Sequence, residues 1–207
     1  MQAPPFGLGK TFYNGTTIDT TDLGGQHLEG VACRWLYDPS STQGQTRTNN
    51  YRQTIVVRNV SGIALLPGRI ALWKSTLFGK RVDGMSNTTA QAVAGIVDDT
   101  LPAAGVPTND LFHLVVSGPC LIRQSLSDLG ADLAQDDWVY AITAATSQAT
   151  TSGRFERFVG TFGDTHTTNG TAANILFNRI GRAMSTSLTS NTNGNVLVWV
   201  DLPTGVR

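Results

Sequence analysis

The sequence has little charge and no long hydrophobic run. Only 14% of its 207 residues are Asp, Glu, Lys or Arg, and 15 basic and 15 acidic residues give a formal net charge of zero. A protein that binds nucleic acid non-specifically needs an excess of basic residues to neutralise phosphates, so we expect no nucleic-acid partner. No stretch approaches the roughly 20 apolar residues of a membrane-spanning helix, so we expect no membrane partner.

Cysteines and known catalytic fingerprints are also scarce. Cys33 and Cys120 are the only cysteines. Two thiols without a CxxC spacing argue against a zinc site or a disulfide framework, although a single bridge between them stays open. The N-terminal stretch MQAPPFGLGKTFYNG has neither the basic nor the apolar segment of a secretory signal. Phosphate loops, nucleophile elbows, zinc-protease motifs and dinucleotide fingerprints are missing, so we expect no cofactor and no metal.

What the sequence does contain is a succession of short apolar runs separated by turn residues. Runs that recur about every 8–12 residues, with turn chemistry between them, are typical of sandwiches and barrels. The expected strands are Val31–Leu36, three runs within Tyr51–Trp73, Ala94–Val97, Leu111–Val116, Cys120–Ile122, Trp138–Ile142, a run within Gly153–Phe162, Ile175–Phe177, Ile180–Ala183 and Val196–Leu202. The sequence therefore predicts an all-β fold, a compact β-barrel or β-sandwich of short antiparallel strands, with at most one short helix, Ser125–Ala134.

The first residues differ from the rest of the chain. Pro4 and Pro5 disfavour a helix, and five glycines within residues 7–25 interrupt any regular element. We divide the chain into an extended N-terminal arm with the first strand, residues 1–50, and a barrel or sandwich domain, residues 51–207. The apolar residues of the arm predict an interface formed by Phe6, Phe12 and Tyr13. Two interpretations stay open, an arm lying on its own domain and an arm reaching a neighbour.

Basic and acidic residues are segregated along the sequence. Residues 1–82 contain nine basic and four acidic residues, whereas residues 83–140 contain one basic and eight acidic residues. These charges are either solvated in loops or form oppositely charged flanks that meet between neighbouring subunits.

The residues that could carry catalysis are few. Asp164 and His166 stand two apart, a spacing that would point both side chains to one face of a strand, but their Gly-, Thr- and Asn-rich surroundings favour an exposed loop. The pairs Asp98–Asp99 and Asp136–Asp137 could bind a cation if folded together, yet each is more typical of a turn. The other histidines are His27 and His113. We therefore predict no catalytic, cofactor-binding or metal-binding residues, and no enzyme.

Several segments carry a resemblance to a known family. The pattern N-x-S-G-x-x-L-x-x-G-R-I-A occupies Asn59–Ala71, LVVSGPCLI occupies Leu114–Ile122, and IGRAM…GNVLVWVDL occupies Ile180–Leu202. In this rhythm of short strands with glycine at the turns, the sequence resembles bacteriophage capsid decoration proteins, also called cement or head-stabilising proteins, over roughly Tyr51–Leu202. The matching residues of the last hairpin are Ile180, Gly181, Ala183, Gly194, Val196, Val198 and Leu202. The first fifty residues match nothing in that family.

The resemblance implies a non-enzymatic virion structural protein, assembled in the host cytoplasm, that binds the capsid exterior and stabilises the head. It implies the major capsid protein as partner and a homo-oligomer, usually a trimer. The alternatives are another phage structural protein, such as a tail-tube or baseplate component, and a glycan-binding β-module. If the arm attaches the protein, deletion of residues 2–30 is expected to leave a folded core and to weaken capsid binding.

Overall fold

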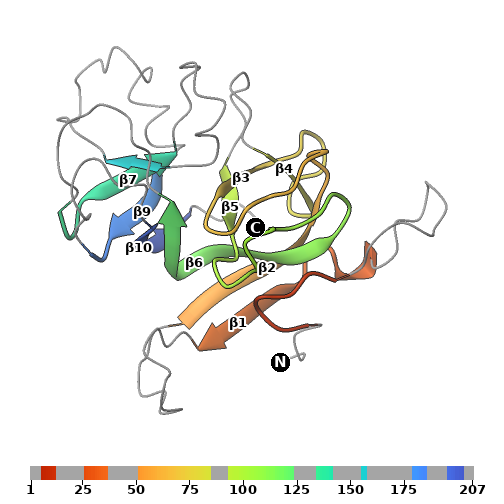
Figure 1. The fold of residues 1–207 in the computed structure, drawn as a ribbon, viewed down its shortest axis with the longest axis horizontal. Helices are drawn as coiled ribbons and strands as arrows, with labels where there is room; N and C mark the ends of the chain where they lie inside the picture. Colours follow the sequence, from red (N-terminus) through yellow and green to blue (C-terminus); the bar gives the residue numbers. More distant parts are fainter. Residues whose placement is uncertain are drawn as a thin grey trace.

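The computed structural model describes residues 6–12, 26–36, 51–84, 93–123, 134–141, 155–157, 179–185 and 195–202. These residues contain ten β-strands and one short 3-10 helix (Figure 1). Their bounds are η1 Gln26–Leu28, β1 Ala32–Leu36, β2 Tyr51–Asn59, β3 Ile70–Trp73, β4 Arg81–Gly84, β5 Val93–Val97, β6 Leu111–Arg123, β7 Trp138–Ala141, β8 Phe155–Arg157, β9 Arg179–Ala183 and β10 Asn195–Asp201. The predicted all-β fold is confirmed. No helix in these residues is long and apolar enough to cross a membrane.

Five of the strands close into a barrel in the order β2-β4-β3-β5-β6, with β6 pairing back onto β2 (Figure 1). The closing β2–β6 pair is antiparallel and runs from Arg58 opposite Leu111 to Gln53 opposite Ser117. The β2–β4 pair is parallel, with Arg58 opposite Arg81. The chain leaves β2, forms β3, and returns as β4 between those two strands, so β4 runs in the direction of β2. Closure removes most of the unpaired strand edges that an open sheet would expose.

Alternate side chains of the barrel strands point into its interior. On β6, Phe112, Leu114 and Val116 are buried inside, as period-two alternation requires. Side chains from the other four strands and from the loop segments complete this core, namely Ile55, Val57, Leu65, Ala71, Trp73, Val82, Ala94, Val97, Leu101 and Val106. The predicted apolar runs thus supply a single closed core inside the barrel.

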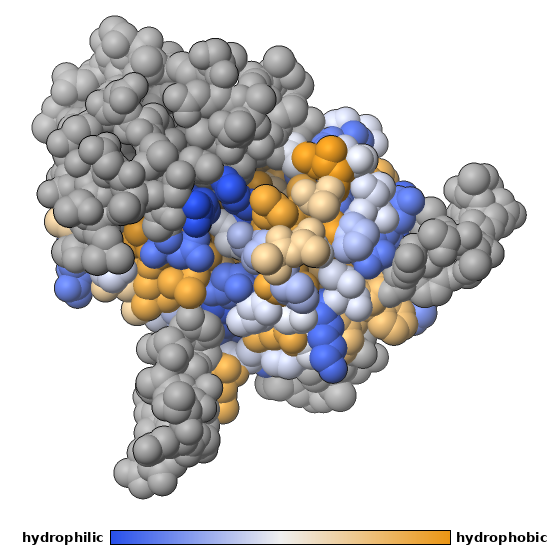
Figure 2. Space-filling model, viewed as in Figure 1, coloured by the Kyte–Doolittle hydropathy of each residue, from blue (hydrophilic) through white to orange (hydrophobic). Residues whose placement is uncertain are grey.

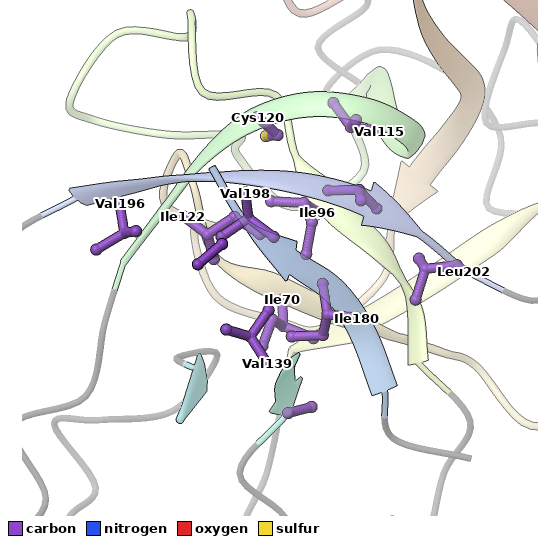
Figure 3. Close-up of a cluster of buried hydrophobic side chains, with 13 residues drawn as sticks. Ile70, Ile96, Val115, Cys120, Ile122, Val139, Ile180, Val196, Val198 and Leu202 are labelled. Atoms are coloured by element: carbon purple, nitrogen blue, oxygen red, sulfur yellow. The ribbon is translucent and has the colours of Figure 1, made fainter. Parts of the chain in front are cut away.

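A second layer extends from the far half of β6. That half pairs with β10, and the sheet continues through β9 and β7 to β8. Ile70, Ile96 and Val115 point outward from the barrel and pack on the inner face of this extension, where Figure 3 shows them with Val198 and Ile180. Strands β3, β5 and β6 are therefore buried on both faces, which explains why their sequences are almost continuously apolar.

The prediction of two strands over Leu111–Val116 and Cys120–Ile122, with a turn between them at Gly118–Pro119, is wrong, because β6 runs unbroken through both residues. Gly118 has a φ of +96°, and a Cβ there would lie 2.1 Å from the Tyr51 carbonyl oxygen. Only glycine permits this conformation and this close approach. The strand bends here as it passes from its pairing with β2 to its pairing with β10. Glycine and proline thus mark a change of partner within one strand.

Other predictions had mixed outcomes. Strand β4 was not predicted, because it is short and places Val82 among polar residues and glycine. The middle run of Tyr51–Trp73 contributes one isolated bridge, Leu65 with Val106, and no strand. Both cysteines are free thiols, so the bridge left open by the sequence is not formed. The helix expected over Ser125–Ala134 lies outside the described residues apart from its last position, which is not helical.

Candidate functional site

The described part of the N-terminal arm, residues 6–12, lies on the outer face of the barrel of its own chain (Figure 1). The Phe12 backbone forms both hydrogen bonds of an antiparallel bridge with Leu111, each 2.9 Å long. The Gly9 amide donates to the Asp98 carboxylate at 2.7 Å. The Phe6 and Phe12 rings stack with their centroids 5.6 Å apart. Residues 6–12 of the arm therefore lie on the domain of their own chain, which was one of the two interpretations left open by the sequence.

His113 sits under the arm at the centre of a hydrogen-bonded chain. Trp35 Nε1 donates to Thr54 Oγ1 at 2.9 Å, and Thr54 Oγ1 lies 3.1 Å from His113 Nδ1. His113 Nε2 lies 2.8 Å from the Phe6 carbonyl oxygen. Because that oxygen can only accept, Nε2 carries the proton, and Nδ1 accepts from the Thr54 hydroxyl. Each hydrogen bond from Trp35 through Thr54 and His113 to Phe6 therefore has one donor and one acceptor when the imidazole is neutral.

Burial supports the same protonation state. The His113 side chain is fully buried beneath the Phe6 ring, 4.5 Å away, and beside the Trp35 ring, 5.1 Å away. Desolvation lowers the pKa of His113, although the hydrogen bond to Phe6 and the charge of Asp98 act in the opposite direction. His113 thus works as a neutral connector between the arm and the barrel wall.

A buried ion pair between Arg52 and Asp99 lies close to the arm and joins β2 to the turn after β5. Arg52 is fully buried and donates to both oxygens of Asp99, at 2.6 and 3.1 Å, and to the Pro119 carbonyl at 2.9 Å. Asp98 lies 3.5 Å from the same guanidinium. Asp98 and Asp99 lie in the turn that follows β5, as predicted. Asp99 binds Arg52 of β2 and accepts from the Leu121 amide of β6, and Asp98 accepts from the Gly9 amide of the arm.

A second buried carboxylate serves two arginines. Glu29 accepts from Arg58 Nε at 2.5 Å and from Arg81 Nε at 3.1 Å. Arg58 also donates to the Asn109 carbonyl at 2.6 Å. This cluster lies wholly within the basic segment 1–82, whereas the pair of Arg52 with Asp99 joins the basic segment to the acidic segment 83–140 inside the subunit. Buried charges require such partners.

The Asn of the N-x-S-G motif organises a loop. Asn59 is fully buried, and its Nδ2 donates to the carbonyls of Ile63 and Val106, at 2.8 and 2.9 Å. Its Oδ1 accepts from the backbone amide and the hydroxyl of Ser61, at 3.0 and 2.7 Å. The motif therefore has a structural role in joining the end of β2 to the loop between β5 and β6.

The predicted interface residues are only partly covered by their own barrel. Phe6 is half-buried against His113, whereas Phe12 keeps 41% of its surface exposed although its backbone is fixed. Tyr13 lies outside the described residues. Nearby, β1 is the terminal strand of the sheet and carries Leu36, which is 53% exposed. Figure 2 shows hydrophobic and hydrophilic side chains interspersed over the face it displays.

The remaining candidates for chemistry are not brought together in the described residues. His27 is exposed in η1, and His113 is enclosed under the arm. Asp164 and His166 lie outside the described residues. Among the residues that the structure describes, no three Asp, Glu, His or Cys side chains gather as metal ligands would. Sequence reasoning did not identify Arg52, Glu29 or Arg58 as key residues, because nothing local signals a partner so distant in the sequence.

Comparison with known proteins gives a likeness among solved structures but no match in sequence. No protein-family model matches the chain, and no curated protein sequence matches it. Among solved structures, the chain is similar to a chain in the structure titled "The capsid of Myoviridae Phage XM1". The two share 14% sequence identity with a TM-score of 0.44, and the match covers 72% of this chain and 83% of the other. A likeness at this level carries no argument about function.

Proposed function

We propose that the protein is a structural component of a bacteriophage virion, a decoration protein that binds the major capsid protein on the outside of the head. The sequence pattern over Tyr51–Leu202 first suggests this role. The observation that carries it is the state of Phe12, an aromatic side chain that is 41% exposed on a backbone held at both its amide and its carbonyl. An apolar anchor fixed in advance loses little conformational entropy when a partner covers it.

The rest of the architecture suits a protein that carries load and does not turn over a substrate. The charged side chains of Arg52, Arg58 and Glu29 are buried in ion pairs that tie together separate strands. The arm and the barrel are further joined through Asp98 and His113. We propose that copies of this unit act together as a trimer, so that several arms bind one lattice and affinity rises through avidity.

The test uses phage heads assembled in a host from which the gene has been deleted. Labelled full-length protein is added to these heads, and binding is measured by co-sedimentation. We expect Phe12→Ser to weaken binding at least tenfold. The matched control is Phe78→Ser, because Phe78 is 62% exposed on the loop between β3 and β4 and does not belong to the arm. Equal binding by the two variants would contradict the role of the arm.

Electron microscopy separates this proposal from its alternatives. Gold-labelled antibody against the protein is expected to decorate the head surface of intact particles. Label confined to the tail or baseplate would replace the decoration role by the other phage structural roles. Absence of label from all particles would reject a virion role.

The buried ion pair of Glu29 makes the deletion of residues 2–30 unsuitable as a test of the arm. Deleting residues 2–30 would remove Glu29 together with the arm and leave Arg58 buried without its carboxylate. The weakened binding of that variant would then reflect a damaged barrel. Deleting residues 2–12 removes the described part of the arm and keeps Glu29, so we expect this shorter variant to be folded and to bind heads poorly.

A further inference from the structure

Two tryptophans and an arginine form a row across the outer face of the second layer. Trp199 of β10 lies opposite Arg182 of β9, and Arg182 lies opposite Trp138 of β7. Residues directly opposite one another in adjacent strands project from the same face of a sheet. The neighbouring residues Val198, Val200, Gly181 and Ala183 are buried, so the row projects away from the core.

A hollow of about 420 Å³ lies over this row. Besides the three residues of the row, it is lined by Gln135 and Asp136 from the turn before β7 and by Asp201 at the end of β10. The volume falls in the range of about 300–1,000 Å³ that is common for small-molecule sites. The hollow therefore combines aromatic surface with amide, carboxylate and guanidinium groups.

The backbone fixes the parts of this hollow. The Asp136 amide donates to the Ala183 carbonyl at 2.8 Å, and the Ala183 amide donates to the Asp137 carbonyl at 2.9 Å, so the turn is clamped to β9. A Cβ at Gly181 would lie 1.9 Å from the Trp199 carbonyl oxygen, so glycine brings β9 and β10 into close contact. The register between β7 and β9 shifts at Val139. Sites held by strands and paired turns keep their geometry better than free loops do.

The two indole rings have different roles. The Trp138 ring is already covered by guanidinium groups, Arg182 at 4.1 Å and Arg179 at 4.5 Å from the ring centroid. This stacking orients Arg182 toward the hollow. Trp199 is 37% exposed, so its indole is the aromatic surface that a ligand could cover.

Charges of both signs line the hollow, which restricts the class of ligand that it could bind. Asp136 and Asp201 contribute two carboxylates and Arg182 contributes a guanidinium group. Arg179 does not line the hollow but lies 3.4 Å from Asp201. A ligand with a full charge of either sign would meet a like charge. A neutral ligand with several hydroxyls would not, because each hydroxyl can donate to a carboxylate and accept from a guanidinium. A sugar ring offers such hydroxyls around its edge and an apolar C–H face for an indole.

We propose that this hollow, formed by Trp199, Arg182, Trp138, Asp136 and Asp201, is a binding site for a neutral glycan, with one sugar ring stacked on Trp199. The site lies on β7, β9 and β10, whereas the arm lies on the barrel. It therefore adds a second binding activity that does not depend on how the protein attaches to a capsid.

The experiment is an NMR titration of the full-length protein, because the four tryptophans give four indole N–H signals. The probes are a panel of neutral oligosaccharides built from glucose, galactose, mannose or N-acetylglucosamine, with sialyllactose as the acidic comparison. The Trp199 signal is assigned from its loss in Trp199→Phe. We expect at least one neutral oligosaccharide to shift the Trp199 signal saturably below 10 mM, as is ordinary for weak single-site binding.

Variants separate a stacked site from a general surface effect. Binding by the variants is followed on the Trp138 indole signal, because Trp138 also lines the hollow and both variants keep it. Trp199→Ala is expected to weaken binding at least tenfold, and Arg182→Gln at least fivefold, while both stay folded because their side chains are exposed. The control is Leu121→Ala, since Leu121 on β6 is also 37% exposed and does not line the hollow. No shift with any neutral oligosaccharide, a response to sialyllactose alone, or equal losses for Trp199→Ala and Leu121→Ala would overturn the proposal.

Discussion

Replacing Asp99 by Asn removes one charge from the buried pair with Arg52 and keeps the shape of the side chain. Arg52 is fully buried, and the side chain of Asp99 is only 5% exposed. The change leaves the guanidinium in a site where water cannot replace the lost carboxylate. It also weakens the acceptor of the Leu121 amide, which lies 2.7 Å from Asp99 Oδ2.

The size of the effect follows from this geometry. Removing one partner of a buried ion pair typically costs about 3–5 kcal/mol of unfolding free energy. Asp98, 3.5 Å from the guanidinium, keeps a second carboxylate nearby, which places the expected loss at the lower end, about 3 kcal/mol. For a chain of this size each kcal/mol shifts Tm by about 2–4 °C, so we expect a decrease of about 6–12 °C.

Urea unfolding followed by circular dichroism measures the loss, with Lys74–Asp83 as the matched control. That pair is also short, 2.7 Å, but its side chains are 41% and 21% exposed. Asp83→Asn is therefore expected to cost less than about 1 kcal/mol. An Arg52→Met/Asp99→Asn double variant should recover part of the loss, because it removes the buried guanidinium while Asp98 keeps its hydrogen bonds from Gly9 and Thr100. Equal losses for Asp99→Asn and Asp83→Asn would refute the reasoning.

Three further outcomes are expected. The pKa of His113 is lowered in the folded state, so the stability that the neutral imidazole contributes is fully present above the unfolded pKa of about 6.5 and is lost as pH falls below that value. The urea midpoint of the native protein should therefore decrease from pH 7.5 to pH 5.5, and it should decrease less in His113→Gln. Gly181→Ala should destabilise by about 2 kcal/mol through overpacking, and a Gly7→Ala variant, with no atom within 4 Å of the added Cβ, should be neutral in the same unfolding assay. A thiol reagent should label half-buried Cys33 in the folded protein and reach buried Cys120 only in denaturant, which mass spectrometry would show.

The predicted strands that the structure contains include β5, which is buried on both faces, and β10, in which buried and more exposed residues alternate. Their hydrophobicity is a local property, so it can be seen in the sequence. The pairing of Arg52 with Asp99 could not be predicted, because the partners are 47 residues apart and meet only when the barrel closes. The docking of the arm was equally hidden, since Phe12 binds Leu111 through backbone atoms that every residue possesses.

The residue types of the proposed glycan site can be read from the sequence, but their arrangement cannot. The tryptophans of β7 and β10 and the arginines of β9 are plain in the sequence, but their alignment depends on register, which shifts between β7 and β9. A shift of one residue places a side chain on the opposite face of a sheet. Ile180 and Arg182 are both at alternate positions of β9, yet one is buried and the other exposed. That difference follows from the irregular pairing and not from the local sequence.

The position of β6 in the chain sets an order for folding during synthesis. The barrel cannot close before β6 has been made, because β2 pairs with it across more than fifty residues of sequence. The arm is made before β6, yet its contacts with Leu111 and His113 do not exist until that strand is in place. Contacts between such distant segments form slowly, because closing the long intervening loop costs entropy. The arm residues are thus made before the barrel strands but placed after them.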